Sequence, residues 1–408
     1  GAENRHRFDN LLETLHIPRP AGGTAVTTKQ AETIAERIGY PALVRPSYVL
    51  GGRAMEIVYN IKDLRAYMST AVKVSPNHPV LIDKYLKGME LEVDAVSDGH
   101  DCLIPGIMEH IEKAGIHSGD SIAVYPPVNL SPEIQQKVVS YTTQLALALK
   151  IKGSLNIQYV YHENELYVLE VNPRSSRTVP FLSKVTGISM INLATKIALG
   201  KTLRDLGYEG GLANPQDFIS IKAPVFSFSK LFLLETSLGP EMKSTGEVMG
   251  INRYLPKALY KALLSSGFSL SPEGRGNILV TIADKDKKEA LPLIQRLSAM
   301  GFKIFATRGT ALFLKEAGLE VDTVNKIREG SPHVVDVIQS GKINLVINTL
   351  TRGKMPNTDG FRIRRSAVEH NIPCFTSLDT AQAAGKIIEE LKLGEDPGVL
   401  SLQEYLHL

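Results

Sequence analysis

The fold is decided between residues 154 and 172, where the sequence reads SLNIQYVYHENELYVLEVN. Two apolar runs, Leu155 to Tyr161 and Leu166 to Val171, enclose the polar turn His162 to Glu165. Short runs rich in β-branched and aromatic residues, separated by such a turn, predict a β-hairpin. We therefore expect two antiparallel strands here.

The length of the turn sets which residues face each other across the hairpin. If Glu163 to Glu165 form a three-residue loop, His162 pairs with Leu166. Gln158 then lies directly across from Glu170, with both side chains on the same face. An amide and a carboxylate are thereby brought together.

Asn172 joins the face that carries Gln158 and Glu170, because side chains alternate along a strand. These side chains offer oxygen ligands of the kind that Mg²⁺ prefers in its octahedral sites. Arg174 and Arg177 follow directly and could clamp a phosphoryl group during its transfer. Spacing alone leaves an equally good alternative, the solvated face of an ordinary hairpin.

The bulk composition excludes several classes of protein. The 408 residues include 46 basic and 43 acidic ones, and the net charge of +3 is too small to indicate a nucleic-acid or membrane-surface partner. The two cysteines, Cys102 and Cys374, lack metal-ligand spacing, which indicates a reducing compartment and a cytoplasmic protein. We expect neither a membrane span nor a signal peptide, since no apolar stretch is long enough.

The pattern along the chain predicts three parts. A helix beginning at Ser131 and another from Met190 to Leu199 precede irregular, Gly- and Pro-containing sequence. From Ser271 onward, strand-like and helix-like segments alternate, which is typical of a parallel α/β sheet. We expect a first domain over 1–210, a connecting helical region over 211–270 and a last domain over 271–408. The alternating segments are Ile278–Ile282, Lys287–Met300, Lys303–Ala306, Thr310–Ala317 and Leu345–Asn348.

A second cluster of polar residues is expected in the last domain. The strand that ends at Ala306 runs into Thr307 and Thr310 at the start of a helix, where backbone N–H groups favour an anion. Parallel sheets bind ligands at the carboxyl ends of their strands. Further polar residues follow the predicted strands; they are Thr281, Lys287, Lys326, Asn348 and Thr349.

Several stretches carry a resemblance to a known family. Residues 170–181 read EVNPRSSRTVPF, residues 44–55 read VRPSYVLGGRAM, and residues 107–121 read IMEHIEKAGIHSGDS. They closely resemble segments of carbamoyl phosphate synthetases among the ATP-grasp enzymes, and the resemblance continues through STGEVMG at residues 244–250. The glycine pair in the second stretch would let a loop fold over ATP phosphates. The resemblance covers nearly the whole chain and points to the carboxy-terminal part of the family's large subunit.

The resemblance implies roles for individual residues of the first domain. Arg45 should contact phosphate, and Gln158, Glu170 and Asn172 should hold Mg²⁺ or Mn²⁺. The other ATP contacts that it implies are Lys84, Leu86, Glu90, Gly115, Ile116, His117 and Ser118, with Gln158 and Glu170 shared between nucleotide and metal. We interpret His117 as a hydrogen-bonding loop residue rather than a general base.

The second ATP-grasp unit of this family phosphorylates carbamate, so the resemblance implies ATP-dependent synthesis of carbamoyl phosphate for arginine and pyrimidine biosynthesis. Carbamate already carries the nucleophilic oxygen. Positioning, with charge neutralisation by the metal and by Arg174 and Arg177, should therefore suffice. The expected architecture is a multidomain α/β and α+β protein, in which an ATP-grasp domain precedes a Rossmann-like parallel α/β domain.

The last domain resembles the methylglyoxal-synthase-like regulatory domain of the same family, through the polar residues above and Ile363 to Val368. Methylglyoxal synthase carries a Gly-Gly-Asp catalytic turn where this chain has Gly330 to His333, so we expect no lyase activity. Lys326 and the absence of tryptophan indicate a nucleotide-binding domain of this type, with UMP or IMP as effector.

Relative to the family, the sequence lacks the first synthetase unit, the small domain before the second unit and the glutaminase. We therefore expect a fragment, with the amino-terminal half of the large subunit and the glutaminase small subunit as partners. Two alternatives stay open. One is another ATP-grasp ligase, such as a biotin carboxylase or an amino-acid ligase; the other is a module that binds ATP and UMP without turnover.

Overall fold

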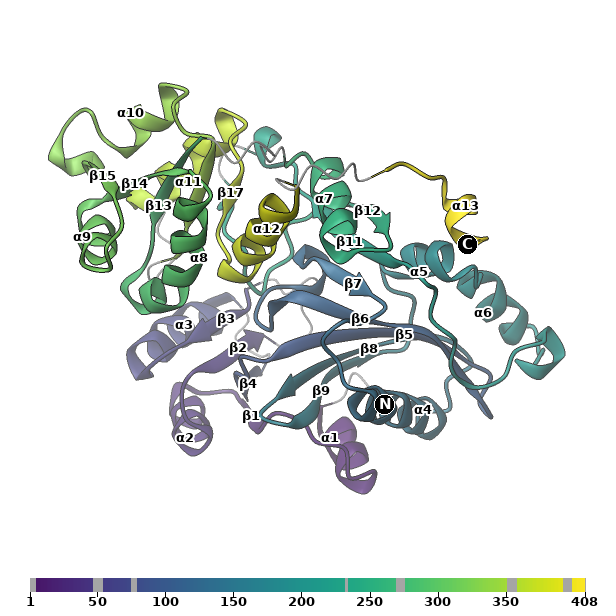
Figure 1. Ribbon diagram of the computed structural model, residues 1–408. Coiled ribbons are helices and arrows are strands. Elements are labelled where there is room, and N and C mark those ends of the chain that lie inside the picture. Colours follow the sequence, from purple (N-terminus) through teal and green to yellow (C-terminus); the bar gives the residue numbers. More distant parts are fainter. Residues whose placement is uncertain are drawn as a thin grey trace. The chain divides into compact units, whose positions relative to one another are not determined.

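The architecture comes from a computed structural model that describes residues 5–46, 54–74, 79–231, 234–268, 276–350, 358–391 and 398–407 (Figure 1). The chain forms two compact units. Unit 1 comprises Gly1–Ser220, Gly239–Met242 and Leu400–Leu408, and unit 2 comprises Ile221–Leu238 and Lys243–Val399. The predicted glycine-pair loop at residues 51 and 52 and the predicted domain start at residue 271 lie outside the described residues. Among the described helices, none is long and apolar enough to cross a bilayer.

Unit 1 contains a small antiparallel sheet in the order β1-β4-β2-β3. Two helices pack on it, and Ala31 and Ala35 of the first are fully buried. Thr27 begins that helix with a capping box, in which Gln30 N–H donates to Thr27 Oγ1. The elements are β1 (Gly22–Ala25), α2 (Thr28–Ile38), β2 (Ala42–Pro46), β3 (Glu56–Val58), α3 (Ile61–Val74) and β4 (Val80–Lys84).

A larger sheet of unit 1 runs in the order β7-β6-β5-β8-β9, and the short β10 pairs with β6. Its strands are β5 (Met89–Ser97), β6 (Cys102–Lys113), β7 (Ala123–Tyr125), β8 (Gly153–His162), β9 (Glu165–Asn172) and β10 (Gly211–Leu212). One face is apolar, with Leu91, Ile157 and Tyr159 in a core that includes Leu12 and Leu145. Because side chains alternate along each strand, the polar residues lie on the other face.

Helices cover the apolar face of this sheet. Leu12 belongs to α1 (Arg5–Thr14) and Leu145 to α4 (Pro132–Ala148), and Figure 1 shows both helices beside β8 and β9. Ser131 begins α4 as predicted, since its Oγ accepts from Ile134 N–H at 3.4 Å. The remaining helices of unit 1 are α5 (Val179–Thr186), α6 (Met190–Ala198) and α13 (Leu402–Leu406).

The turn between β8 and β9 is shorter than predicted. His162 pairs with Glu165, so the predicted pairing with Leu166 is wrong. Glu163 and Asn164 form a two-residue turn with φ of 50° and 64°. Two successive positive φ angles are typical of a type I′ turn, whose twist matches that of the flanking strands.

A register shift compensates for the shorter turn. Tyr159 pairs with Val168, and the next pair along the ladder is Gln158 with Glu170, so Leu169 is the extra residue of a bulge. The predicted pairing of Gln158 with Glu170 is therefore confirmed. The prediction made the turn one residue too long and missed the one-residue bulge. These two errors cancel, so the pairing at Gln158 is the one predicted.

Unit 2 is entered through β11 (Ile219–Val225), which neighbours β12 (Gly246–Asn252). Helix α7 (Leu255–Ser265) packs closely on β12 at Gly250. A Cβ added there would lie 2.2 Å from the carbonyl oxygen of Ala258, so only glycine allows this approach.

The rest of unit 2 is a parallel sheet in the order β15-β14-β13-β16-β17, which confirms the predicted α/β alternation. The strand order reverses between β13 and β16, and sheets of this kind bind ligands at such a point. The strands are β13 (Asn277–Thr281), β14 (Lys303–Thr307), β15 (Val321–Val324), β16 (Leu345–Asn348) and β17 (Cys374–Phe375). The helices are α8 (Lys287–Ala299), α9 (Arg308–Glu316), α10 (Val334–Gln339), α11 (Asp359–Glu369) and α12 (Leu378–Leu391).

Candidate functional site

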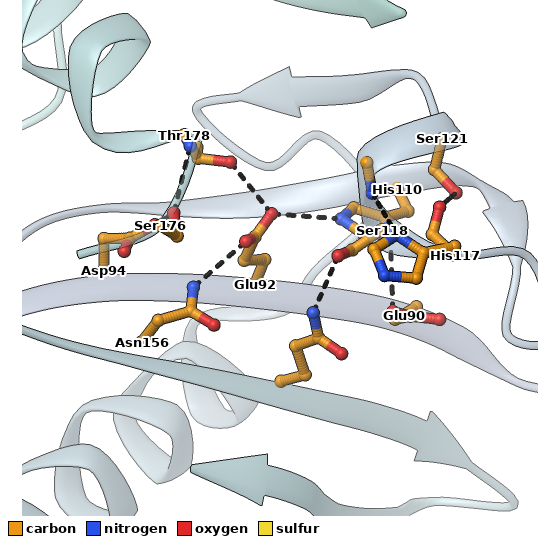
Figure 2. A network of polar contacts seen from close by, with 12 residues as sticks. Glu90, Glu92, Asp94, His110, His117, Ser118, Ser121, Asn156, Ser176 and Thr178 are labelled. Atoms are coloured by element: carbon orange, nitrogen blue, oxygen red, sulfur yellow. Dashed lines mark hydrogen bonds and ion pairs between the residues drawn. The ribbon is translucent and has the colours of Figure 1, made fainter. Parts of the chain in front are cut away.

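The polar face of the larger sheet in unit 1 carries the candidate site (Figure 2). Glu90, Glu92 and Asp94 of β5 are all buried, with residue exposures of 4%, 3% and 0%. Buried carboxylates require hydrogen-bond donors or cations. The cross-strand register supplies amide neighbours, since Glu92 pairs with Gln158 and Asp94 pairs with Asn156.

Three side chains approach Glu92. Asn156 Nδ2 donates to its Oε1 at 3.0 Å, and Thr178 Oγ1 donates to its Oε2 at 3.1 Å. His110 Nε2 lies 3.7 Å from Oε2 of Glu92, and Nδ1 of the same ring lies 3.8 Å from Oε1 of Glu90. Figure 2 shows the imidazole reaching toward both carboxylates from β6. The floor of the site is thus a connected polar network.

Asp94 holds the segment that follows β9. Ser176 Oγ donates to Asp94 Oδ2 at 2.7 Å, and Thr178 N–H donates to Ser176 Oγ at 2.9 Å (Figure 2). The same segment carries the exposed side chains of Arg174 and Arg177. The buried carboxylate therefore sets the path of the two predicted phosphoryl-binding arginines.

The predicted metal ligands lie together at the edge of this face. Glu170 pairs with Gln158 and accepts a hydrogen bond at 2.9 Å from Asn172 Nδ2. Arg45 Nη1 of the small sheet lies 3.7 Å from Glu170 Oε2. Gln158 Nε2 donates to Ser118 Oγ at 2.7 Å, which leaves Oε1 as the acceptor atom of that side chain.

The loop after β6 reaches the same region. Gly115 has a φ of 111°, and a Cβ added to it would lie 2.8 Å from the hydroxyl oxygen of Tyr85. His117 Nδ1 accepts from Gly119 N–H at 3.0 Å. Burial lowers the pKa of His117 below its ordinary value, although Asp120 partly opposes this. The ring is therefore neutral and hydrogen-bonded within the loop.

Residues 239–242, which also belong to unit 1, contact this loop and Arg177. Gly239 O accepts from His117 N–H at 2.8 Å, and Met242 Sδ lies 3.0 Å from Arg177 Nη1. Nothing in the local pattern of these residues indicated a role at the site.

The other residues expected near a nucleotide lie around the junction of the two sheets. Lys84 Nζ donates to the carbonyl oxygen of Tyr40 at 3.0 Å. Leu86, in the segment between β4 and β5, and Ile116, beside Gly115, are both partly buried. Tyr85, between Lys84 and Leu86, donates from its hydroxyl to the carbonyl oxygen of Ala114 at 2.5 Å, so this segment neighbours the loop of Gly115 and Ile116, while Glu90 lies in the buried network.

The donor set fits a hard divalent cation such as Mg²⁺. It consists of the Glu170 carboxylate and the amide oxygens of Gln158 and Asn172, which suit a metal that takes its other ligands from phosphates and water. Across the described part of the chain, no group of three or more His, Cys, Asp or Glu could hold a metal ion. The one carboxylate and two amides would leave the other positions of an octahedral cation to phosphate and water oxygens.

Several residues of the network were not predicted from the sequence. They are Glu92, Asp94, His110, Asn156 and Thr178. A signal was present for some of them, because Asn156 lies two residues before Gln158 on the same strand and so shares its face. Only the tertiary structure shows that the acidic face of β5 is buried, because an alternating pattern is equally typical of a strand whose polar face is in solvent.

Unit 2 brings its predicted polar residues to the carboxyl edge of the parallel sheet. Thr281 and Asn348 end neighbouring strands, and Asn348 Nδ2 donates to Thr281 Oγ1 at 2.6 Å. Thr349 Oγ1 accepts from Ala283 N–H at 2.9 Å, and Thr310 Oγ1 accepts from Ile282 N–H at 3.2 Å. These hydroxyls already support the loop that follows β13.

The other members of this set differ in their bonding. Thr307 precedes the first turn of α9 and makes no capping hydrogen bond with its side chain. Lys287 Nζ lies 2.7 Å from Asp284 Oδ1. Lys287, with a smaller contribution from Lys326, lowers the pKa of Asp284. Lys287 Nζ also donates to the carbonyl oxygen of Gly309 at 2.8 Å, beside the start of α9.

Comparisons with known proteins agree with this organisation. Residues 4–206 match the family described as carbamoyl-phosphate synthase L chain, ATP binding domain, and residues 289–376 match the MGS-like domain. The chain is similar, at 20% identity and a TM-score of 0.52, to the biotin carboxylase domain of Hydrogenobacter thermophilus 2-oxoglutarate carboxylase, solved with MgADP, ADP and bicarbonate. That match covers 65% of this chain and 66% of that chain.

A Campylobacter jejuni biotin carboxylase–β,γ-ATP complex matches at 20% identity and a TM-score of 0.47, over 55% of this chain and 51% of that chain. The chain thus spans less than two thirds of either protein. The two family matches and the Hydrogenobacter thermophilus structure confirm the expected fold, in which an ATP-grasp unit precedes a parallel-sheet MGS-like domain.

Proposed function

The chain belongs to the ATP-grasp ligases and has the domain arrangement of the carboxy-terminal part of the carbamoyl phosphate synthetase large subunit, and from this premise we propose that unit 1 phosphorylates carbamate with ATP. The products are carbamoyl phosphate and ADP. We further propose that unit 2 binds UMP or IMP as an effector at its carboxyl edge.

One observation carries the catalytic proposal. Gln158, Glu170 and Asn172 share one face of the larger sheet, and Arg45 lies 3.7 Å from Glu170. A single carboxylate, flanked by amides and a guanidinium, suits the triphosphate of a metal–nucleotide complex. In this proposal Gln158, Glu170 and Asn172 hold Mg²⁺ or Mn²⁺, and the bound ion neutralises the phosphate charge.

The arginines after β9 orient and neutralise the group that is transferred. The carbamate oxygen attacks the γ-phosphorus while the bond from that phosphorus to the β–γ bridging oxygen breaks, and ADP leaves with the electron pair. No proton transfer is needed, since carbamate is already anionic. Arg174 and Arg177 supply positive charge beside the developing transition state. Neutral His117 is bonded to Gly119 through Nδ1 and takes a positioning role.

The reverse reaction tests the proposal most directly. The chain is incubated with MgADP and carbamoyl phosphate, and ATP formation is followed with a coupled assay. Glu170→Gln should abolish ATP formation, while Glu163→Gln, at the exposed turn of the same hairpin, should leave it unchanged. If the parent binds MgATP yet forms no ATP from carbamoyl phosphate, the protein is a nucleotide-binding module on its own.

A biotin carboxylase activity is the second candidate, because the similar Hydrogenobacter thermophilus structure is a biotin carboxylase domain. ATP hydrolysis that requires bicarbonate and free biotin would favour it. ATP formation from carbamoyl phosphate without biotin would favour carbamate kinase chemistry. The expected partners, the amino-terminal half of the large subunit and a glutaminase small subunit, form part of the same proposal.

A further inference from the structure

Met242 lies against one of the two arginines that are proposed to bind the transferred phosphoryl group. Its Sδ is 3.0 Å from Nη1 of Arg177, a distance at which the guanidinium N–H donates to the sulfur. Both residues belong to unit 1. The contact therefore joins a methionine that the sequence did not place at the site to a guanidinium with a proposed role in catalysis.

The loop after β6 holds the sulfur at this position. A Cβ added to Gly119 would lie 3.1 Å from Met242 Sδ and 3.3 Å from Arg177 Nη1, so a larger residue there would crowd both groups. The segment that carries Met242 is bonded to the same loop, since Gly239 O accepts from His117 N–H at 2.8 Å. The sulfur thus has a defined place beside the guanidinium.

A thioether and a sulfoxide differ in how strongly they hold a guanidinium. A thioether sulfur is a weak acceptor, so Arg177 exchanges this contact for a phosphoryl oxygen at little cost. Oxidation of methionine to the sulfoxide adds a polar oxygen to the side chain. A hydrogen bond from a charged donor to such an oxygen is strong, and it competes with the phosphoryl group for Arg177.

We propose that Met242 is an oxidation site, through which peroxides lower the phosphoryl-transfer activity of unit 1 by holding Arg177 away from the substrate. This inference rests on the proposed function. A sulfur lone pair attacks one oxygen of hydrogen peroxide, so that an S–O bond forms and the O–O bond breaks. The proton of the attacked oxygen passes to the leaving hydroxide, which becomes water. Sulfur is oxidised by two electrons, the peroxide is reduced, and a methionine sulfoxide reductase reverses the change.

Met242 is the most exposed methionine in the described part of the chain. Its exposure is 37%, whereas Met68 and Met108 are completely buried and the remaining described methionines are buried or partly buried. The two thiols are poor competitors for a peroxide. Burial raises the pKa of Cys102 and of Cys374 to about 12, and the thiolate is the reactive form of cysteine. A mild peroxide treatment should therefore modify Met242 first.

The test uses the whole chain before and after treatment with hydrogen peroxide. Peptide mass spectrometry quantifies oxidation at Met242, with buried Met108 as the internal reference. ATP formation from MgADP and carbamoyl phosphate should fall about tenfold in the oxidised parent. The affinity for MgADP, measured by calorimetry, should stay within about twofold, because Arg177 is proposed to contact the transferred group. Treatment with a methionine sulfoxide reductase should restore the rate.

Three variants separate Met242 from other targets of the peroxide. Met242→Leu keeps the volume but lacks the sulfur, so its rate should be the same with and without peroxide. Met242→Gln places an amide oxygen where the sulfoxide oxygen would be, so without peroxide it should be about tenfold slower than Met242→Leu. Met249→Leu is the matched control, because it removes a methionine of β12 and should respond to peroxide as the parent does.

The outcomes distinguish this inference from the proposed function. A loss of rate in peroxide-treated Met242→Leu, or equal rates for Met242→Gln and Met242→Leu without peroxide, would overturn the inference alone. A parent that keeps its rate with Met242 fully oxidised would do the same. If the untreated parent forms no ATP, the proposed function is wrong and the inference is lost with it.

Discussion

Arg45 Nη1 lies 3.7 Å from Oε2 of Glu170, so the two sheets of unit 1 are joined by an ion pair at the proposed metal site. The side chains are 24% and 39% exposed, and solvent therefore screens the pair. Pairs of this kind contribute about 1 kcal/mol or less to stability. In the proposed complex Arg45 contacts a phosphate instead of Glu170, and Glu170 contacts the cation instead of Arg45.

Glu170→Gln should separate activity from stability. Loss of the charged member of the proposed ligand set should reduce the rate of phosphoryl transfer by at least about 100-fold, as removal of one transition-state contact commonly does. The melting temperature should change little, because the lost pair is partly exposed. Rate assays and thermal melts check this against Glu163→Gln. Equal activity in both variants would show that Glu170 is not a metal ligand.

Substitutions at Glu163 should report on the type I′ turn. Its φ of 50° suits Asn better than Glu and disfavours β-branched residues. Glu163→Asn should stabilise unit 1 by about 0.5 kcal/mol, and Glu163→Val should destabilise it by about 1 kcal/mol. Urea unfolding of the two variants measures the difference. The reverse order would contradict the two-residue turn.

Gly106→Ala should destabilise the larger sheet. A Cβ at this position in β6 would lie 2.3 Å from Cε2 of Tyr125, a ring that is only 1% exposed and has no space to move into. Overpacking of this kind costs about 1–3 kcal/mol. Gly246→Ala serves as control in a strand, because its nearest neighbour, Val225 Cβ, would be 3.9 Å away. A parent-like melting temperature for Gly106→Ala would be inconsistent with this packing.

His117 should make the protein less stable in mild acid. Burial lowers its folded-state pKa, so below the ordinary value of 6.5 the unfolded chain binds a proton that the folded chain does not. Stability is therefore fully present above pH 6.5 and falls as the pH is lowered from there toward the depressed folded-state pKa. Unfolding at pH 7.5 and pH 5.5 should show a smaller loss for His117→Asn than for the parent. The same loss in both would place the acid sensitivity elsewhere.

Thr307→Ala and Thr310→Val should have different effects in unit 2. Thr307 makes no capping bond with its side chain, so its loss should weaken UMP or IMP binding with little effect on stability. Thr310 accepts from buried Ile282 N–H, so its loss should cost about 1–3 kcal/mol. Calorimetry and melting of both variants provide the measurements. MgATP affinity serves as the internal control and should be unchanged in Thr307→Ala.

Local pattern was sufficient for much of the fold. Alternating runs in 154–172 indicated the hairpin, Ser131 and Pro132 marked the start of α4, and strand–helix alternation in the last domain indicated a parallel sheet. These features depend on residues close in sequence, where period and capping are strong signals. The predicted hairpin turn was one residue too long, because type I′ turns also form with sequences other than Asn-Gly, here Glu163-Asn164.

The sequence by itself determined the order of an ATP-grasp unit and a parallel α/β domain and which residue types would carry the chemistry. Only the tertiary structure decided that Glu92 and Asp94 are buried beneath the metal-ligand candidates, that Gly239 to Met242 reach the loop at His117, and that Glu235 pairs with Arg364. Burial and pairing between distant segments depend on which surfaces meet when the sheets and helices pack. Periodicity specifies a face, but not what will cover it.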